Sequence, residues 1–334
     1  KSLFKTAFGS LEGIGVTLGK STPLVLSGLA VAVGLRAGLF NIGAQGQFIA
    51  GAIGASWVGF TFDLPVGIHV VAAIAAAMLF SGLYGGFVGL LKARTGAHEV
   101  IVTIMLNYVA LNLFSFFLRT PGLLLEKDGG GTPKADPALE TAVLPNLFTD
   151  QYRLNWGLII AIGATFFYWW LMERSTIGYR FRMVGFNANA ARAAGIRVER
   201  TFVWAMAASA AFAGLAGANQ GLTAVGGVTP SIHANIGFDA ITVALLGGSR
   251  AGGIFAAGLL FGAFKAGGPA MQVVGVAPEI LHVVQALIVM FIAAPPLIRA
   301  LFRLPQPPKR KPISEWFAAR LGKGSASTEQ KVSN

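Results

Sequence analysis

The residues with the clearest chemical potential are uncharged amides that stand inside apolar sequence. The candidates are Asn41, Gln45, Gln47, Asn107 and Asn219. An amide carries donors and an acceptor but no charge, which suits hydrogen bonding to a polar, neutral solute. The alternative is that these amides bond neighbouring helices to one another. Each amide is expected to take one of these two roles, because leaving an amide without a hydrogen bond in an apolar surrounding costs several kcal/mol of free energy.

Three of these amides share the glycine-rich run RAGLFNIGAQGQFIAGAIGA (36–55). Glycines recur in this run and disfavour a regular helix along its whole length. We therefore expect an irregular backbone element here, either beside a translocation path or in close helix packing.

Ionisable side chains also occur near apolar segments: Glu99, Asp239, Lys265 and His282. Each lies near a segment end or, for Lys265, carries a stem long enough to reach an interface. We expect structural roles for them.

Signatures of enzymes and metal sites are missing from the sequence. The stretch GIGVTLGKS has Ile14 where a phosphate-binding loop requires its first glycine. The four histidines are isolated and the chain has no cysteine. The sequence therefore predicts no catalytic residue, metal or cofactor in this chain, so energy for transport would come from an ion gradient or an ATP-binding partner.

A polar loop at residues 173–200 has the features of a docking element. Asn187 is a plausible helix N-cap, 188–194 has high helix propensity, and Gly195 is a natural residue after the helix end. We expect a helix of about two turns, with Ala190, Ala191 and Gly195 placing small residues on one face. The alternative is a basic loop that only anchors topology.

Composition indicates that membrane helices must position these residues. Hydrophobic residues make up 54% of the 334 and charged residues 12%, too little to cover a soluble surface. Apolar segments lie at 22–35, 38–62, 66–91, 99–118, 154–172, 201–222, 237–248, 254–274 and 280–298. The first, second and seventh are short or glycine-interrupted and could be half-helices or re-entrant. The predicted fold is an all-α polytopic transmembrane bundle over 1–300.

The distribution of basic residues predicts the orientation. One set of alternate connections, including the loop 173–200 and the tail, carries 18 of the 26 Lys and Arg, and the opposite set carries seven. The richer set is expected in the cytoplasm. The loop 119–153 is then extracellular, and the basic, flexible tail 301–334 is cytoplasmic and faces anionic lipid. Nucleic acid does not fit, because the basic residues are dispersed.

Several motifs together resemble the permease subunits of bacterial ABC importers for nucleosides and simple sugars, which are related to branched-chain amino acid and ribose permeases. The matching stretches are TPL to GL (22–29), RAGLFNIG (36–43) with Gln47, HEVIVTIMLNYVALN (98–112), GFN to GI (185–196) and GFDAITVALLGG (237–248). The resemblance covers about residues 8–298.

This resemblance implies a bacterial cell membrane protein whose loop 173–200 docks a coupling helix on an ATP-binding subunit. The implied coupling residues are Asn187, Ala190, Ala191, Arg192 and Gly195. ATP and Mg²⁺ would bind the partner subunit, and the five amides would border the solute path. Further implied partners are a second permease, related or identical, and an extracellular substrate-binding protein.

The chain departs from the family pattern at two positions. Gln45 stands where the nucleoside branch more often has Glu, and His98 stands where it more often has Asn. The family also begins with a membrane helix before the region matching 8–10, and adding it would give ten spans.

Other functions remain open on the sequence alone. A simple sugar or a branched-chain amino acid suits an ABC permease as a nucleoside does. An ion-coupled secondary transporter would need intramembrane acids or unwound helices for its coupling site. An integral membrane enzyme would need a convergent acid, base or metal set.

Overall fold

The computed structural model describes residues 6–125, 133–147, 154–224, 226–273 and 279–293, and the fold within them is helical. The helices in chain order are α2 (Leu11–Arg36), α3 (Ala44–Thr61), α4 (Ile68–Thr95), α5 (Glu99–Phe117), α6 (Gly157–Arg174), α7 (Thr176–Phe186), α8 (Ala188–Ala193), α9 (Val198–Thr223), α10 (Ile236–Leu246), α11 (Ala251–Val273) and α12 (Glu279–Ala293). Within the described residues, each of the nine predicted apolar segments corresponds to one helix, which confirms the all-α prediction; residues 274 and 294–298 of the predicted segments lie outside them. The predicted tail 301–334 lies outside the described residues.

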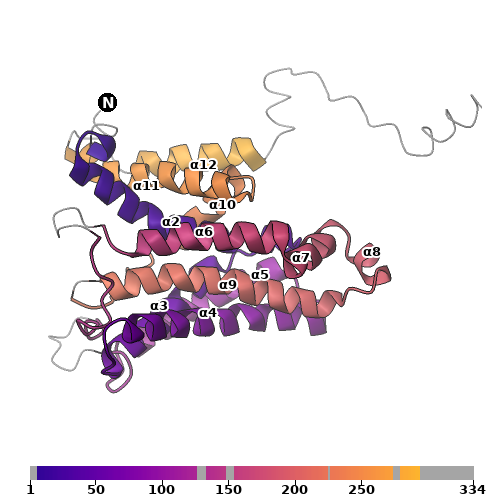
Figure 1. Ribbon diagram of the computed structural model, residues 1–334, viewed down its shortest axis with the longest axis horizontal. Coiled ribbons are helices and arrows are strands. Elements are labelled where there is room, and N and C mark those ends of the chain that lie inside the picture. The colour runs from indigo at the N-terminus through magenta and orange to yellow at the C-terminus, as the bar shows by residue number, and fades with distance from the viewer. Residues whose placement is uncertain (1–5, 126–132, 148–153, 225, 274–278, 294–334) are drawn as a thin grey trace, which may run out of the picture. The chain divides into compact units, whose positions relative to one another are not determined.

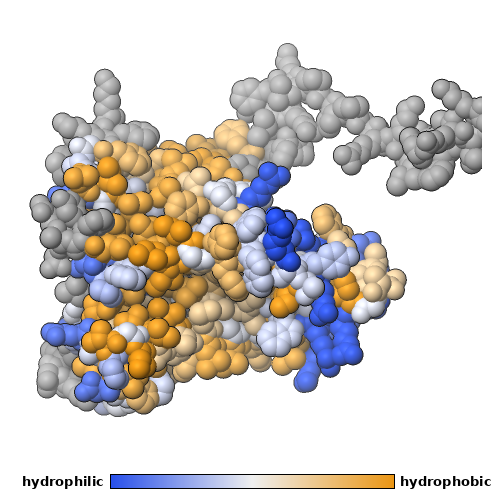
Figure 2. All heavy atoms as spheres, viewed as in Figure 1, coloured by the Kyte–Doolittle hydropathy of each residue, from blue (hydrophilic) through white to orange (hydrophobic). Residues whose placement is uncertain are grey.

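Five of the described helices are long and apolar enough to cross a membrane: α2, α4, α5, α9 and α11. They differ in how much of their surface is covered by protein. Only 22% of the most apolar stretch of α4 and of α5 is buried, against 78% for α2. Figure 2 shows an apolar surface over much of the bundle. Helices such as α4 and α5 therefore present an apolar face suited to lipid, whereas α2 is an interior helix.

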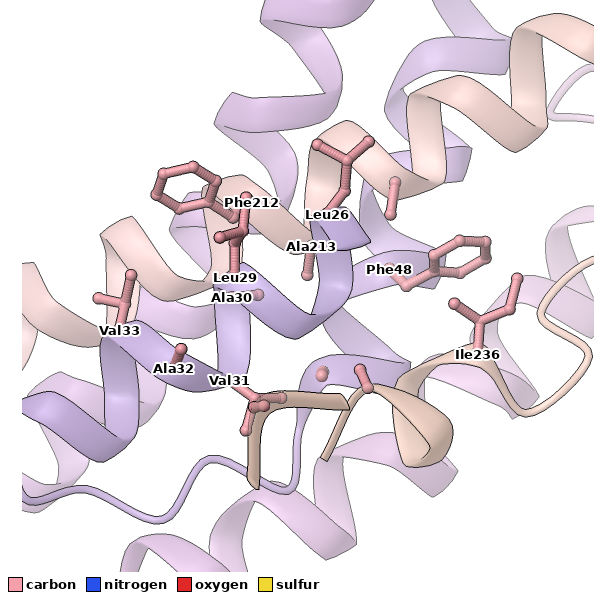
Figure 3. Close-up of a cluster of buried hydrophobic side chains, with 14 of the residues drawn as sticks. Leu26, Leu29, Ala30, Val31, Ala32, Val33, Phe48, Phe212, Ala213 and Ile236 are labelled. Atoms are coloured by element: carbon pink, nitrogen blue, oxygen red, sulfur yellow. The ribbon is translucent and has the colours of Figure 1, made fainter. Parts of the chain in front are cut away.

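Helix α2 forms the centre of the core. Every residue from Ser21 to Gly34 is buried. Its apolar side chains pack among residues of α3, α9 and α10, as Phe48, Phe212 and Ile236 illustrate in Figure 3. Helices α9, α11 and α10 make the most extensive contacts with it. A helix that is apolar on all sides is expected in this position.

The first apolar segment is a full helix, so the alternative of a half-helix was wrong for this segment. Helix α2 has 26 residues and continues through Pro23. The hydroxyls of Ser21 and Thr22 donate to carbonyls four residues earlier, at 2.7 and 3.0 Å. These bonds reach the carbonyls of Thr17 and Leu18, in the turn of the helix before Pro23. The second segment does contain irregular backbone, at 37–43, before α3 begins.

Small residues bring α3, α4 and α9 close together. A Cβ atom built on Gly51 of α3 would lie 2.5 Å from the Cα of Gly214 in α9. Ser81 of α4 donates towards the carbonyls of Gln47 and Ala210, at 2.8 and 2.5 Å. Without a hydrophobic driving force between membrane helices, such close packing and hydrogen bonding hold them together.

The two ends of the bundle differ. At one end, the described parts of the loop 119–153 pack on the helices, where Ala135 N–H donates to the Val228 carbonyl and Leu139 N–H to the Gly59 carbonyl, both at 2.9 Å. At the other end, α7 follows the end of α6 and lies beside the start of α9, and α8 lies further out (Figure 1). We call this second end the α8 end.

Candidate functional site

The loop after α6 contains two short helices, one more than the sequence analysis predicts. Ser175 caps the first, α7, by accepting a hydrogen bond from Gly178 N–H at 3.0 Å. Phe181 and Val184 on α7 are buried, three residues apart. A serine followed by apolar residues three positions apart is a recognised signal for the start of an amphipathic helix. The sequence therefore contains a signal for α7, although the sequence analysis predicts only the helix that follows it.

Helix α8 carries the caps that the sequence predicts at both of its ends. The Asn187 side chain accepts from the N–H groups of Asn189 and Ala190, both at 3.0 Å. Gly195 has a φ of +82°. Gly195 N–H donates to the Arg192 carbonyl, and Ile196 N–H donates to the Ala191 carbonyl, both at 3.0 Å. This is the Schellman pattern of a helix end. The helix itself is shorter than expected, six residues from Ala188 to Ala193.

The exposed face of α8 does not include all the small residues assigned to it. Ala190, Arg192 and Gly195 are exposed. Ala191 is 4% exposed and packs in a cluster with Val184 and Val198. The expectation that Ala190, Ala191 and Gly195 share one face was therefore wrong, because Ala191 faces the chain's own α7 and α9. Ala191 fixes the helix in place, while its neighbours are free to contact a partner.

Ion pairs and close backbone packing attach the loop to the membrane helices. Glu173 accepts from Arg36 of α2 at 2.8 Å and from Arg182 of α7 at 2.9 Å. A Cβ atom on Gly185 would lie 2.4 Å from the Arg36 carbonyl oxygen, so α7 touches the end of α2 directly. Arg192 pairs with Glu199 of α9 at 2.6 Å. A displacement of α8 would therefore be passed to α2 and α9.

Three of the predicted amides lie together around the irregular segment 37–43. Asn41 Nδ2 donates to Gln47 Oε1 and to Ser209 Oγ, both at 2.8 Å. Asn41 Oδ1 accepts from Gly43 N–H at 2.9 Å. Asn107 Oδ1 accepts from Gly46 N–H at 2.8 Å, and its Nδ2 donates to the Ile42 carbonyl at 3.0 Å. These amides are buried and bonded within the chain, so they hold the irregular backbone in place.

Gln45 is the one described amide of the candidate set with a buried, unbonded group. Its Oε1 accepts from Gly237 N–H of α10 at 2.8 Å, whereas its Nε2 has no partner. The side chain is 1% exposed. It links α3 to the start of α10 and leaves its amide nitrogen, with two N–H donors, unbonded.

Asn219 does not join this group. Its Nδ2 lies 3.3 Å from Asn155 Oδ1, next to the start of α6. Asn219 follows Ser209 by ten residues on α9, which places it about 15 Å further along the helix axis. The structure therefore brings Asn41, Gln47 and Asn107 together and separates Asn219 from them.

The predicted ionisable residues form pairs rather than isolated charges. Glu99 pairs with Lys92 at 2.6 Å, and Asp239 of α10 pairs with Lys265 of α11 at 2.6 Å. The side chain of His282 is not among those that the structure describes. No group of three potential metal-binding residues occurs in the described part of the chain.

Sequence reasoning missed two hydroxyls that complete the amide group. Ser209 accepts from Asn41 and donates to the Ala30 carbonyl of α2 at 2.6 Å, and Ser81 bonds α3 to α9. Both serines are 0% exposed. Small residues in an apolar helix are common, so their type and spacing gave no signal that could have singled them out.

Apolar helices long enough to cross a bilayer, internally bonded amides and a capped helix at one end define a multi-pass membrane protein. Comparison with known families then specifies the kind. Residues 13–294 match the family described as branched-chain amino acid transport system / permease component, and the chain belongs to this family. It is therefore a transport component rather than an enzyme.

The chain is similar over most of its length to curated ABC transporter permeases. It is 41% identical over 300 residues to the guanosine permease protein of Bacillus subtilis, covering 89% of this chain and 86% of that protein. It is 37% identical over 320 residues to the nucleoside permease protein of Lactococcus lactis, covering 94% and 86%. It is 31% identical over 303 residues to the glucose permease protein of Haloferax volcanii, covering 87% and 78%. No solved structure matches the chain significantly. As a permease of this type, the chain works with an ATP-binding subunit and a substrate-binding protein.

Proposed function

We propose that this chain is the membrane subunit of an importer that passes a nucleoside across the membrane by alternating access. The energy comes from ATP hydrolysed, with Mg²⁺, on the separate ATP-binding subunit. The identities of 41% and 37% to guanosine and nucleoside permeases support the solute class.

The observation that carries this function is the capped helix α8. Asn187 and Gly195 fix its two ends, and Ala190 and Arg192 are exposed on it. Through Ala191 and the pair of Arg192 with Glu199, it is braced against the helices behind it. A rigid, exposed helix of this kind fits a groove on the ATP-binding subunit. Closure of that subunit would move α8 as a lever and tilt α2 and α9.

The amides suit a neutral solute that offers hydroxyls and ring nitrogens. Asn41, Gln47 and Asn107 support the polar segment 37–43 through hydrogen bonds within the chain. We assign direct contact with the solute to Gln45 in a state of the transport cycle that uncovers its side chain, because its buried Nε2 is the unbonded amide nitrogen of the set. Asn219 would border the path at the other end of the bundle.

The proposed setting is a bacterial cell membrane, with the α8 end and the C-terminus in the cytoplasm. A second permease, identical or related, would complete the path opposite this chain, and lipid would cover the apolar faces. Because the chain has no cysteine, single-cysteine variants test this orientation. An impermeant maleimide added outside intact cells should label E140C in the loop 119–153 and leave T95C, at the exposed end of α4 and outside the docking helix, unlabelled until the cells are opened. The opposite pattern would reverse the orientation.

A simple sugar is the second candidate solute, since the glucose permease of Haloferax volcanii is 31% identical. The deciding experiment is uptake by the whole importer in a bacterial strain without its own nucleoside uptake. Radiolabelled guanosine should accumulate, with competition by uridine but not by glucose or leucine. A matched strain whose ATP-binding subunit lacks its phosphate-loop lysine should show no uptake.

Two outcomes would contradict the proposal. Uptake of glucose or leucine, with no guanosine uptake, would assign a different solute to the same fold. Guanosine uptake that persists without a working ATP-binding subunit would favour an ion-coupled transporter.

A further inference from the structure

A long groove runs between α6 and α9 and ends at the loop that carries α8. Its volume is about 1090 Å³. This is at the upper limit for sites that hold small molecules, so the groove has room for a larger occupant. Along most of its length it is lined by apolar groups, including Phe167 of α6 and Trp204 and Phe212 of α9. Trp204 is 67% exposed, so the groove opens sideways on the apolar surface of the bundle.

Three arginines line the groove at the α8 end: Arg180, Arg197 and Arg200. All three are exposed, and none makes an ion pair or side-chain hydrogen bond with the described residues. Nearby arginines behave differently, because Arg182 pairs with Glu173 and Arg192 with Glu199. No acidic residue is among the described residues that line the groove. The acids of this loop thus neutralise arginines elsewhere and leave a cluster of three free positive charges at the groove mouth.

The length of the groove matches one leaflet of a bilayer. On α9 it extends from Arg200 to Leu215. Fifteen residues of helix span about 22 Å, and half of a bilayer with its headgroups is about 20–22 Å thick. The charge lies at one end of this length and the apolar wall fills the rest. Figure 2 likewise shows hydrophilic residues gathered at the α8 end and an apolar surface next to them.

We propose that this groove is a binding site for an anionic phospholipid, with its phosphate on Arg180, Arg197 and Arg200 and an acyl chain between α6 and α9. Guanidinium groups bind phosphate oxygens through paired hydrogen bonds. Basic pockets between membrane helices at the cytoplasmic side commonly bind such headgroups. A neutral lipid would fill the apolar part but leave the charges unmatched. A protein helix would need acidic residues at the matching level.

The lipid would also touch the coupling element. Ala194, Gly195 and Ile196, which follow α8, line the same groove. A bound phosphate would draw α7 and the start of α9 together behind α8. The lipid site therefore holds the loop in the position from which it can dock, whichever solute the permease carries.

The first test measures lipid retention by the purified importer complex. The complex is reconstituted in nanodiscs of phosphatidylcholine with phosphatidylglycerol, released into mild detergent and weighed by native mass spectrometry. Each arginine should contribute about five-fold in affinity, so the triple variant R180Q/R197Q/R200Q should bind phosphatidylglycerol roughly a hundred-fold more weakly. The control R94Q/R174Q/R250Q removes three cytoplasmic-loop charges outside the groove and should retain the lipid. Equal retention by both variants would overturn the proposal.

The second test identifies what lies in the groove. Because the chain has no cysteine, A211C places a unique thiol on its wall and A75C a matched thiol on the exposed face of α4. Each is coupled to a photoreactive maleimide in the assembled complex. A phospholipid adduct at A211C that is enriched in phosphatidylglycerol relative to A75C is expected. A crosslink from A211C to a protein, whether a partner subunit or another segment of this chain, would refute the lipid site.

Discussion

Replacing Gly195 with alanine should weaken docking of the ATP-binding subunit without disturbing the membrane helices. Gly195 adopts a φ of +82°, the left-handed region that L side chains rarely adopt. A Cβ atom there would meet nothing within 4 Å. The penalty is therefore conformational rather than a clash with the rest of the chain.

The size of the effect follows from this geometry. A left-handed conformation costs an ordinary residue about 1–2 kcal/mol. Helix α8 has six residues and cannot offset this cost by its own stability, because helices so short are marginal in isolation. A cost of 1–2 kcal/mol lowers the ratio of the correctly ended helix to its other conformations about 5–30-fold. The apparent Kd for the ATP-binding subunit should rise by at most this factor, because α8 is largely formed in the unmodified chain.

The assay is a titration of the permease in nanodiscs with its ATP-binding subunit, followed by guanosine-stimulated ATP hydrolysis. G195N is the decisive comparison, because asparagine is larger than alanine but tolerates the left-handed region better. We expect G195N to retain more affinity than G195A. G252A, at an open glycine of α11, should behave as the unmodified chain.

Two results would refute this reasoning. Unchanged affinity in G195A would mean that the end of α8 does not control docking. Lower affinity in G195N than in G195A would mean that side-chain size at the interface matters more than backbone conformation.

Three further outcomes are expected. The variant G51L should lose about 3 kcal/mol or more of stability through overpacking and unfold at a lower temperature in detergent, because its Cβ would meet the Gly214 backbone at 2.5 Å; G252L is the control. The variant N41L should lower the free energy of unfolding by about 1–3 kcal/mol for each buried partner of Asn41 that it leaves unbonded. The control N112L, at an exposed position, should lower it little in the same thermal-unfolding assay. D239N should lower uptake and thermal stability more than D239N/K265M does, because the single change leaves the Lys265 charge unpaired; equal losses would argue against the pair.

The helices could be predicted from the sequence because an apolar segment that lies in lipid can satisfy its backbone groups only by forming a helix. Each apolar segment became a helix, since backbone groups in an apolar medium must bond within the segment. The distinction between interior and lipid-facing helices was not predictable in the same way. The hydropathy of α2 is no higher than that of α4, yet α2 is largely buried. Burial depends on which neighbours surround a helix, and composition does not record them.

In the candidate site, features set by neighbouring residues were likewise predictable, whereas features set by distant residues were not. The caps of α8 were predictable because capping is local: Asn187 bonds residues two and three positions away. The inward direction of Ala191 was not, since it depends on packing against Val184 and Val198 in three dimensions. Asn41 was recognised as an amide that needs a partner. Its partner Ser209 lies 168 residues away and carries no local signal.

The central position of α2 also has a consequence for biosynthesis. Its Ala30 carbonyl accepts from Ser209, which is made 179 residues later. At about 5–20 residues per second, the ribosome needs roughly 10–35 s to supply that partner. During this interval the nascent α2, with Ser21, Thr22 and Ser27, has none of its permanent neighbours from α9 onwards. A chain that stops before Val198 would therefore lack α9, α10 and α11, and would leave the faces of α2 that these helices cover exposed to lipid.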